Sequence, residues 1–344
     1  IGSMDVPRII APGETATFDV IIDPNNDTLV GGSQTLFYRF DGGAFQSVPL
    51  SSTGGDNYEA MLPAPACGDA PEFYVAAESV ETGMVTDPPN APAEVFTADV
   101  GVLNIVFEDD AETDLGWSLG VPGDTATTGI WERVVPVGTA AQPGSDNSED
   151  GTFCFVTGNA PPGAGIGDND VDGGTTTLLS PEIVIPAGQD VRISYFRWFS
   201  NDASAAPNTE PFFVDISADN GPWVNVETIG PAGEGTSGGW IFHEFTVSDF
   251  VSPSSNVRVR FVTQDPDPGS LVEAAVDDFN VTYIECAVTK SCVGDLDGDG
   301  SVGASDLGAL LGSWGLTDVP GDLDGGGVGA SDLGTLLGSW GPCP

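Results

Sequence analysis

The segment Gly294-Asp-Leu-Asp-Gly-Asp-Gly-Ser-Val-Gly-Ala-Ser-Asp-Leu-Gly-Ala-Leu-Leu-Gly-Ser-Trp-Gly315 occurs a second time, slightly shortened, as Gly321-Asp-Leu-Asp-Gly-Gly-Gly-Val-Gly-Ala-Ser-Asp-Leu-Gly-Thr-Leu-Leu-Gly-Ser-Trp-Gly341. In the first copy, carboxylates occupy positions 1, 3, 5 and 12 of a loop whose sixth residue is glycine: Asp295, Asp297, Asp299 and Asp306. This is the spacing of an EF-hand-type loop, in which alternate residues supply oxygens to one cation. The first copy therefore predicts a Ca²⁺ site, to which Ser301 would add its backbone carbonyl.

The second copy departs from this pattern. It keeps Asp322, Asp324 and Asp332, but its loop is one residue shorter, and Gly326 stands where the first copy has an aspartate. Because fewer oxygens can reach the cation, we expect this loop to bind Ca²⁺ weakly or not at all.

Each loop is followed by the apolar spacing of a short amphipathic helix. The apolar positions are Leu307, Leu310, Leu311 and Trp314 in the first copy and Leu333, Leu336, Leu337 and Trp340 in the second. Helices this short are not stable alone, so we expect the two apolar stripes to pack against each other.

Residues 290–344 resemble the dockerin domain of secreted bacterial proteins, on the strength of this loop–helix repeat. The resemblance implies a cohesin-like protein partner that reads the residue pair at loop positions 10 and 11. In this sequence the pairs are Ala304 with Ser305, and Ala330 with Ser331. The alternative is that the repeat is only a calcium-stabilised terminal cap.

The composition limits the classes of partner. Fifty-two acidic residues against eight basic ones give a net charge of −44, which would repel phosphate backbones and anionic membranes. No apolar run approaches the length that spans a bilayer. We therefore expect no nucleic-acid partner and no membrane insertion. The acidity and the calcium loop fit an extracellular or cell-surface location.

The chain has five cysteines, so at least one thiol is unpaired within it. Cys292 and Cys343 bracket the repeat, which favours a disulfide closing that domain. Pairing of Cys286 with Cys292 is the alternative, and the sequence leaves it open.

Residues 1–101 predict an immunoglobulin- or fibronectin-like β-sandwich. Apolar residues alternate with polar ones at Ala16, Phe18, Val20 and Ile22, and Asp41-Gly-Gly43 predicts a hairpin turn. Short strands separated by turn residues, without helical periodicity, are typical of such modules. We expect a supporting role for this domain.

Residues 105–285 predict a larger all-β domain, a jelly-roll sandwich. The run Arg192-Ile-Ser-Tyr-Phe-Arg-Trp-Phe199 has the aromatic content of a central strand, and Asp219-Asn-Gly221 predicts a turn between two strands. The whole chain is thus expected to be mostly β, with a small helical C-terminal domain.

Three segments carry a second resemblance. Phe107-Glu-Asp-Asp-Ala-Glu-Thr-Asp-Leu-Gly-Trp117, Thr175-Thr-Thr-Leu-Leu-Ser-Pro181 and Val272-Glu-Ala-Ala-Val-Asp-Asp-Phe-Asn-Val281 resemble the MAM-like and carbohydrate-binding-module-like jelly rolls of secreted bacterial enzymes. The resemblance implies a structural calcium held by Glu108, Asp110 and Asp277, with Asp109 and Asp278 as alternates. The alternative is that these carboxylates cap strand ends and face water. Residues 1–285 together look similar to the non-catalytic tail of secreted zinc carboxypeptidases and related hydrolases.

The sequence does not favour catalysis. His243 is the only histidine, and neither a zinc-ligand cluster nor a Gly-x-Ser-x-Gly elbow is present. Aromatic side chains in the jelly roll could instead stack on sugar rings, and Trp131 is the preferred candidate because charged residues flank it.

We therefore expect a non-catalytic, secreted, calcium-stabilised protein or accessory region that docks to a protein partner through its C-terminal domain. The first alternative is a self-assembling structural subunit of a surface layer, filament or matrix. The second is a carbohydrate-binding adhesin acting through the jelly roll.

Overall fold

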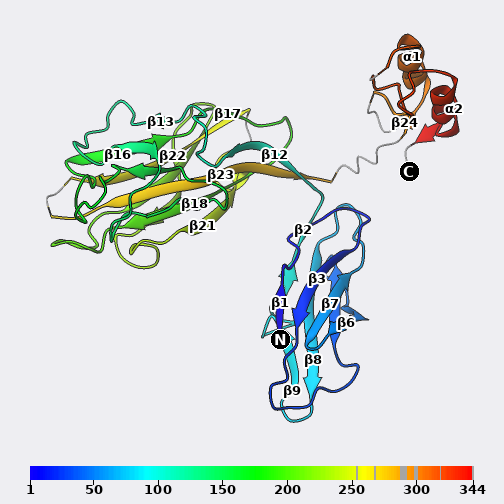
Figure 1. Ribbon diagram of the computed structural model, residues 1–344, viewed down its shortest axis with the longest axis horizontal. Helices are drawn as coiled ribbons and strands as arrows, with labels where there is room; N and C mark the ends of the chain where they lie inside the picture. Colours follow the sequence, from blue (N-terminus) through cyan, green and yellow to red (C-terminus); the bar gives the residue numbers. More distant parts are fainter. Residues whose placement is uncertain (253–254, 267–268, 287–292, 298–300, 318, 343–344) are drawn as a thin grey trace. The chain divides into compact units, whose positions relative to one another are not determined.

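The computed structural model describes residues 1–252, 255–266, 269–286, 293–297, 301–317 and 319–342. Strands hold 41% of the chain and helices 6%, which confirms the mostly-β prediction. The chain divides into two compact units, Ile1–Val102 with Cys286–Pro344, and Leu103–Glu285. Figure 1 shows the ribbon with its elements labelled.

The N-terminal segment folds into two antiparallel sheets. One has the order β1-β3-β7-β6 and contains β1 (Gly2–Met4), β3 (Ala16–Ile21), β7 (Asn57–Leu62) and β6 (Ser51–Gly54). The other has the order β10-β8-β4-β5, with β9 paired to β8, and contains β10 (Phe96–Thr97), β8 (Pro71–Ser79), β4 (Thr35–Phe40), β5 (Gln46–Pro49) and β9 (Gly83–Asp87). A short parallel pair joins β2 (Ile9–Ile10) to β11 (Asp99–Val100).

The predicted alternation in this segment is confirmed. Phe18, Val20 and Ile22 are buried, and they pack with residues of the facing sheet such as Leu36 and Phe73. The predicted turn after Phe40 is also present, because β4 and β5 pair as a hairpin across Asp41-Gly-Gly43.

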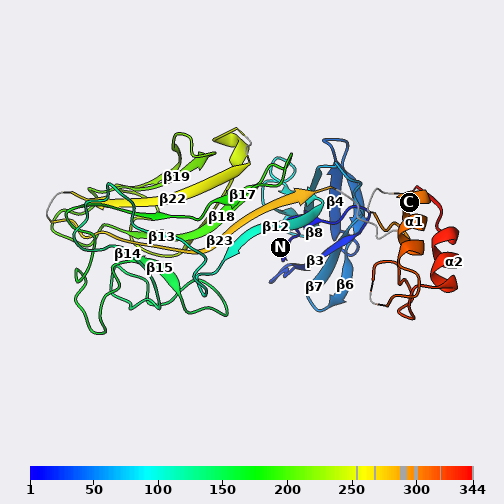
Figure 2. The ribbon, with the colours of Figure 1, turned by 90° about the horizontal axis from the view of Figure 1, so that it is seen from above.

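The second sandwich has two six-stranded sheets, whose layers are visible in Figure 2. The first sheet, called sheet A here, has the order β14-β15-β23-β18-β21, with β12 paired to β23: β14 (Trp131–Val134), β15 (Cys154–Thr157), β23 (Glu273–Glu285), β18 (Arg192–Ser200), β21 (Ile241–Thr246) and β12 (Val102–Asp109). The second, called sheet B, has the order β13-β16-β22-β19-β20, with β17 paired to β22: β13 (Ser118–Leu119), β16 (Gly174–Leu179), β22 (Asn256–Asp265), β19 (Phe212–Ala218), β20 (Val224–Ile229) and β17 (Ile183–Val184). A 3₁₀ turn, η1 (Val247–Asp249), follows β21.

The core of this sandwich is aromatic. Its largest fully buried side chains are Trp131, Tyr195, Phe199, Phe212, Phe261 and Phe279. As predicted, the segment 192–199 forms a central strand, since β18 lies between β23 and β21. The predicted turn at Asp219-Asn-Gly221 connects β19 to its hairpin partner β20.

The C-terminal repeat folds into two loop–helix units, α1 (Ala304–Gly312) and α2 (Ala330–Gly338), joined by a short pairing of β24 (Ser301–Val302) with β25 (Gly341–Pro342). Its small core is built from equivalent residues of the two copies: Val302 and Leu310 from the first, Val328 and Leu336 from the second.

The prediction that the two apolar stripes pack against each other is confirmed for part of each stripe, since Leu307, Leu310, Leu333 and Leu336 share one core. Leu310 and Leu336 are completely buried, but Leu311, Trp314, Leu337 and Trp340 are about half exposed. Nine-residue helices have room for only a narrow contact, so one leucine per helix is enclosed and the next one faces outward.

The observed cysteine pairing excludes one of the two disulfides that the sequence left open. Cys67 and Cys286 form a disulfide with their Cα atoms 5.5 Å apart, which excludes pairing of Cys286 with Cys292. Cys154 is a free, buried thiol. The predicted partners Cys292 and Cys343 lie outside the described residues.

Candidate functional site

The repeat brings three carboxylates together in each copy. Oxygens of Asp295, Asp297 and Asp306 all lie within 4.8 Å of one another, and so do those of Asp322, Asp324 and Asp332. A hard cation such as Ca²⁺ is held by several oxygens at 2.3–2.6 Å, so opposed ligands stand at most about 5 Å apart. Both triads meet this requirement. Asp299, the predicted fifth-position ligand, lies outside the described residues.

The last carboxylate of each loop also organises the backbone. Fully buried Asp306 accepts the N–H of Gly303 through Oδ2 (2.7 Å) and that of Leu296 through Oδ1 (2.7 Å). Asp332 makes the two equivalent bonds, both 2.8 Å. These N–H donors, the one at the helix N-cap first, lower the pKa of both carboxyls, so both are ionised at neutral pH.

The two copies differ between their third and twelfth positions. In the second copy, the N–H of Gly326 donates to Asp324 (2.9 Å) and the N–H of Gly327 donates to Asp322 (3.1 Å). The residue that replaces the aspartate thus binds a neighbouring carboxylate and supplies no side-chain oxygen. The triad geometry is nevertheless shared, and the weaker affinity of this loop stays a prediction.

The residue pairs predicted to meet a protein partner are accessible. Ala304 and Ser305 open α1, Ala330 and Ser331 open α2, and all four are exposed. The half-exposed leucine and tryptophan side chains that the narrow core leaves out belong to the same two units.

The carboxylates predicted to bind calcium in the second sandwich are not assembled as expected. Glu108 and Asp110 are exposed, whereas Asp277 is almost fully buried. Within the described ranges, only the two loop triads bring three carboxylates within 4.8 Å. The alternate residue Asp109 is turned inward and accepts the indole N–H of Trp117 (2.6 Å). Because side chains alternate along β12, Glu108 lies on the opposite face, and Asp110, which follows the end of the strand, is also exposed.

Asp277 has different acidic neighbours. Its Oδ2 accepts the N–H of Asn147 (2.7 Å), and burial, with the charges of Asp278 and Asp146, raises its pKa to about 7. Burial and the charge of Glu112 likewise raise the pKa of Asp146, whose Oδ2 is buried with no hydrogen-bond partner in the described part of the chain. Mutual repulsion of this kind would be relieved by a cation.

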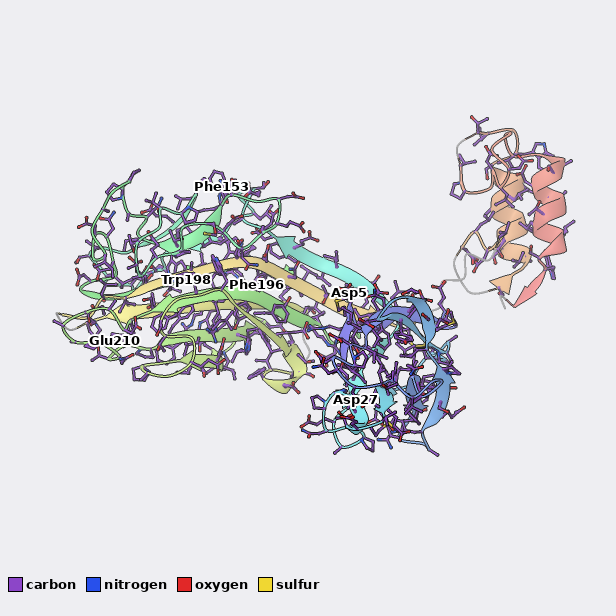
Figure 3. The ribbon with its side chains drawn as sticks, turned by 60° about the horizontal axis from the view of Figure 1, so that its bottom comes forward. Asp5, Asp27, Phe153, Phe196, Trp198 and Glu210 are labelled. Atoms are coloured by element: carbon purple, nitrogen blue, oxygen red, sulfur yellow. A yellow bond between two sulfur atoms is a disulfide. The ribbon has the colours of Figure 1, made fainter. Side chains whose placement is uncertain are left out.

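The outer face of sheet A, which points away from the core, carries a group of aromatic side chains. Phe196 and Trp198, both labelled in Figure 3, alternate along β18 with the buried Tyr195 and Phe199. Phe196 lies opposite Phe242 of β21, with ring centroids 5.3 Å apart, and Phe242 is 45% exposed.

Two tryptophans continue this aromatic group. Trp198 and Trp240 meet edge to face at 6.0 Å, and their indole N–H groups donate to the carbonyls of Ala141 (2.7 Å) and Ser145 (3.3 Å). The segment that precedes β15 therefore holds both indoles in place. The indoles border the phenylalanine pair on one side.

Polar residues border the phenylalanine pair on the other side. Glu244 of β21, Ser194 of β18 and Asn280 of β23 are aligned across three neighbouring strands, two positions from Phe242 and Phe196. Because residues two apart share a face, aromatic rings and hydrogen-bonding groups occupy one surface. The strict alternation in residues 192–199 indicates from the sequence that Phe196 and Trp198 share one face of the strand. The pairing of Phe196 with Phe242, however, depends on the register of β21.

Trp131, the predicted glycan-binding residue, is not on any surface. It is 1% exposed and packs against Phe212 in the core, so the prediction is corrected. The flanking charge misled because Glu132, the neighbour of Trp131, points to the opposite, exposed face of the strand.

His243 lies beside Tyr195, and its Nδ1 is 3.6 Å from a carboxylate oxygen of Glu227. Burial lowers its pKa, with an opposing contribution from Glu227. The neutral imidazole thus belongs to a packed polar group inside the sandwich.

Neither a protein-family model nor a curated protein matches this chain. Several solved structures are similar to it in fold. A structure of carbohydrate-binding modules from the β-sandwich superfamily is 14% identical, covers 82% of this chain and 96% of its own, and gives a TM-score of 0.36. The tandem CBM22 domain of Paenibacillus barcinonensis Xyn10C is 14% identical over 80% of each chain, with a TM-score of 0.31.

A third similar structure, Caldicellulosiruptor saccharolyticus CBM27-1 in complex with mannohexaose, is 11% identical, covers 54% of this chain and 98% of its own, and gives a TM-score of 0.31. These likenesses concern the β-sandwich arrangement alone. Among the described helices, none is long and apolar enough to cross a membrane.

Proposed function

We propose that the second sandwich binds carbohydrate through the outer face of sheet A. The observation that carries this proposal is the pair formed by Phe196 and half-exposed Phe242 beside the polar row of Glu244, Ser194 and Asn280. A pyranose offers an apolar C–H face and a rim of hydroxyls, and such a surface matches both.

The direct test is retention on soluble polysaccharides in affinity gel electrophoresis, with xylan, mannan and mixed-linkage β-glucan in parallel gels. Loss of an aromatic contact of about 1.4 kcal/mol weakens binding about ten-fold, so Phe242→Ala should strongly reduce retention on the bound polysaccharide. Val184→Ala is the matched control, because Val184 is 67% exposed on β17 of sheet B. Equal retention of the wild type, Phe242→Ala and Phe196→Ala would refute the proposal.

We further propose that the C-terminal repeat binds Ca²⁺ and docks to a cohesin-like protein partner. The two carboxylate triads support the metal, and the exposed Ala-Ser pairs support the docking surface. Light scattering behind size exclusion, with Ca²⁺ and with EGTA, separates this role from a structural one. A monomer in both buffers supports docking, whereas Ca²⁺-dependent assembly would identify a self-associating subunit.

A calcium ion in the second sandwich also remains a proposal, with a changed ligand set. Asp277 is retained, and Asp146, whose Oδ2 is buried with no hydrogen-bond partner among the described residues, joins it in place of Glu108 and Asp110. Calcium should then raise the midpoint of the second-sandwich transition as well, and Asp146→Asn should remove that increase. An unchanged response in Asp146→Asn would exclude these ligands.

A further inference from the structure

A shallow pocket of about 120 Å³ opens on the other sheet of the second sandwich. It lies where the turn of the β19–β20 hairpin meets the start of β22 and the segment before β17. Its lining is one aromatic ring surrounded by polar groups: Trp223, Arg258, Glu182, Asp219, Asn220 and Ser217.

The ring of Trp223 is fixed from one side. The guanidinium of Arg260 lies 4.4 Å from its centroid, and Arg260 is itself held by Asp215 at 2.8 Å. A cation over an indole face is a favourable contact, and the ion pair fixes the cation. Trp223 therefore forms part of the pocket wall, as a partly buried apolar ring whose orientation is fixed by Arg260.

Arg258 lines the pocket with a guanidinium that is not fully hydrogen-bonded by the described residues. Its Nε is buried and has no hydrogen-bond partner among the described residues, whereas Arg260, two positions along β22, is paired. Acidic residues outnumber basic ones by fifty-two to eight in this chain, yet Arg258 forms no ion pair among the described residues, whereas Arg39, Arg197 and Arg260 do. An unpaired N–H donor that is withdrawn from water is costly, and a ligand oxygen bound to the other N–H groups of the guanidinium would compensate part of that cost.

The remaining lining groups decide the charge of the ligand. Glu182 and Asp219 contribute two carboxylates against the single guanidinium of Arg258, so an anionic ligand would meet net repulsion. A neutral ligand with adjacent hydroxyls fits better, since a hydroxyl both donates to a carboxylate and accepts from a guanidinium. Asn220 could do the same through its amide.

We infer that this pocket, here named the Trp223 pocket, binds one neutral saccharide residue, with its C–H face on Trp223 and its hydroxyls on Arg258 and Glu182. The inference rests on the proposed carbohydrate-binding function but assigns a second site on the opposite sheet. The volume admits one sugar ring in part, so an isolated glycoside should bind with Kd on the order of 1 mM.

The probe is methyl β-D-glucopyranoside or methyl α-D-mannopyranoside, titrated to about 50 mM, well above the expected Kd, into the whole ¹⁵N-labelled chain. At least one of them should shift the indole N–H resonance of Trp223 and the amide of Gly221. Arg258→Gln should weaken the response at least ten-fold, and Trp223→Phe should weaken it less. Arg8→Gln, which removes one exposed arginine from the other sandwich, should leave it unchanged.

Absence of a shift with both neutral glycosides would overturn the inference. So would a response to D-glucuronate alone, which would show that the pocket selects an anion. The two carbohydrate sites can be separated, because Phe242→Ala should leave the Trp223 shifts intact. Retention on polysaccharide without any Trp223 response would reject this pocket and leave the proposed function standing.

Discussion

Arg197 of β18 and Glu227 of β20 form an ion pair across the interior of the second sandwich. Nε of Arg197 lies 3.0 Å from both carboxylate oxygens and Nη2 lies 2.5 Å from Oε1, with the two side chains only 8% and 15% exposed. The hydroxyl of Tyr195 donates a hydrogen bond to Oε2 of the same carboxylate (3.2 Å). The two sheets of this sandwich are therefore linked by charge as well as by apolar contact.

Removing one member of this pair should destabilise the sandwich strongly. Glu227→Ala leaves the guanidinium buried without its counter-charge, and we expect the free energy of unfolding to fall by about 3–5 kcal/mol. Tryptophan fluorescence during urea unfolding is a suitable measure, since five of the seven tryptophans lie in this sandwich. The double variant Arg197→Met with Glu227→Met should recover most of the loss. A double variant as unstable as Glu227→Ala would show that packing, and not charge, is responsible.

Calcium removal should affect the C-terminal repeat before the sandwiches. Metal binding contributes directly to the folding of a small domain whose core is mainly four fully enclosed side chains, so EGTA should lower its calorimetric midpoint first. Asp306→Ala should have a larger effect than Asp332→Ala on Ca²⁺ affinity measured by calorimetry, if the longer loop binds more tightly. Equal losses would show that the shared triads, and not loop length, decide affinity. No change of the midpoint with EGTA would exclude calcium-dependent folding.

The second sandwich should lose stability as the pH rises from about 4 to 7. Burial, reinforced by the charges of Asp172 and Asp265, raises the pKa of Asp170 to about 7, so the folded state binds a proton there that the unfolded state has released. The stability associated with this proton is fully present below the unfolded pKa and is lost as the pH passes through the folded pKa. The slope from this group is about 1.4 kcal/mol per pH unit.

Asp170→Asn should flatten that part of the curve, which urea midpoints measured at several pH values would record. Asp168→Asn is the matched control, because Asp168 is an exposed carboxylate in the same loop. Identical pH slopes in the wild type and Asp170→Asn would contradict the assignment.

Substitutions of Trp131 and of Phe242 should have separate effects, the first on stability and the second on carbohydrate binding. Trp131→Ala empties a fully buried site and should cost about 3–5 kcal/mol of unfolding free energy. Under conditions where the variant is still folded, its retention on polysaccharide should equal that of the wild type. Phe242→Ala should show the reverse, with little change in stability and strongly reduced retention. Loss of binding in folded Trp131→Ala would mean that the core and the outer face are coupled.

The cysteines give a chemical test of the connectivity. Peptide mapping without reduction should recover Cys67 linked to Cys286. Cys154 is completely buried, and that burial raises the pKa of its thiol far above the usual value, so iodoacetamide should label it only after unfolding. Labelling of native Cys154, or a Cys286–Cys292 peptide, would contradict the structure.

Local patterns predicted the elements well where one face of a strand is buried. The alternation around Phe18 and Val20 and the glycine turn after Phe40 identified strands and a hairpin, because side chains alternate with a period of two and few residues fit a tight turn. The last aspartate of each loop was also predictable, since the loop spacing determines which oxygens converge. The sandwich calcium ligands were not, because Glu108 and Asp277 belong to strands whose facing directions depend on register.

The sequence by itself thus determined the mostly-β composition and the carboxylate triads of the repeat, both of which depend on residues close together in the chain. Only the tertiary structure decided that Trp131 is in the core, that Phe242 stands beside Phe196, and that Trp223 shares a pocket with Arg258. Each of these depends on strand register and sheet pairing across many residues. A one-residue shift in the register of a strand would turn the same side chains to the opposite face of the sheet.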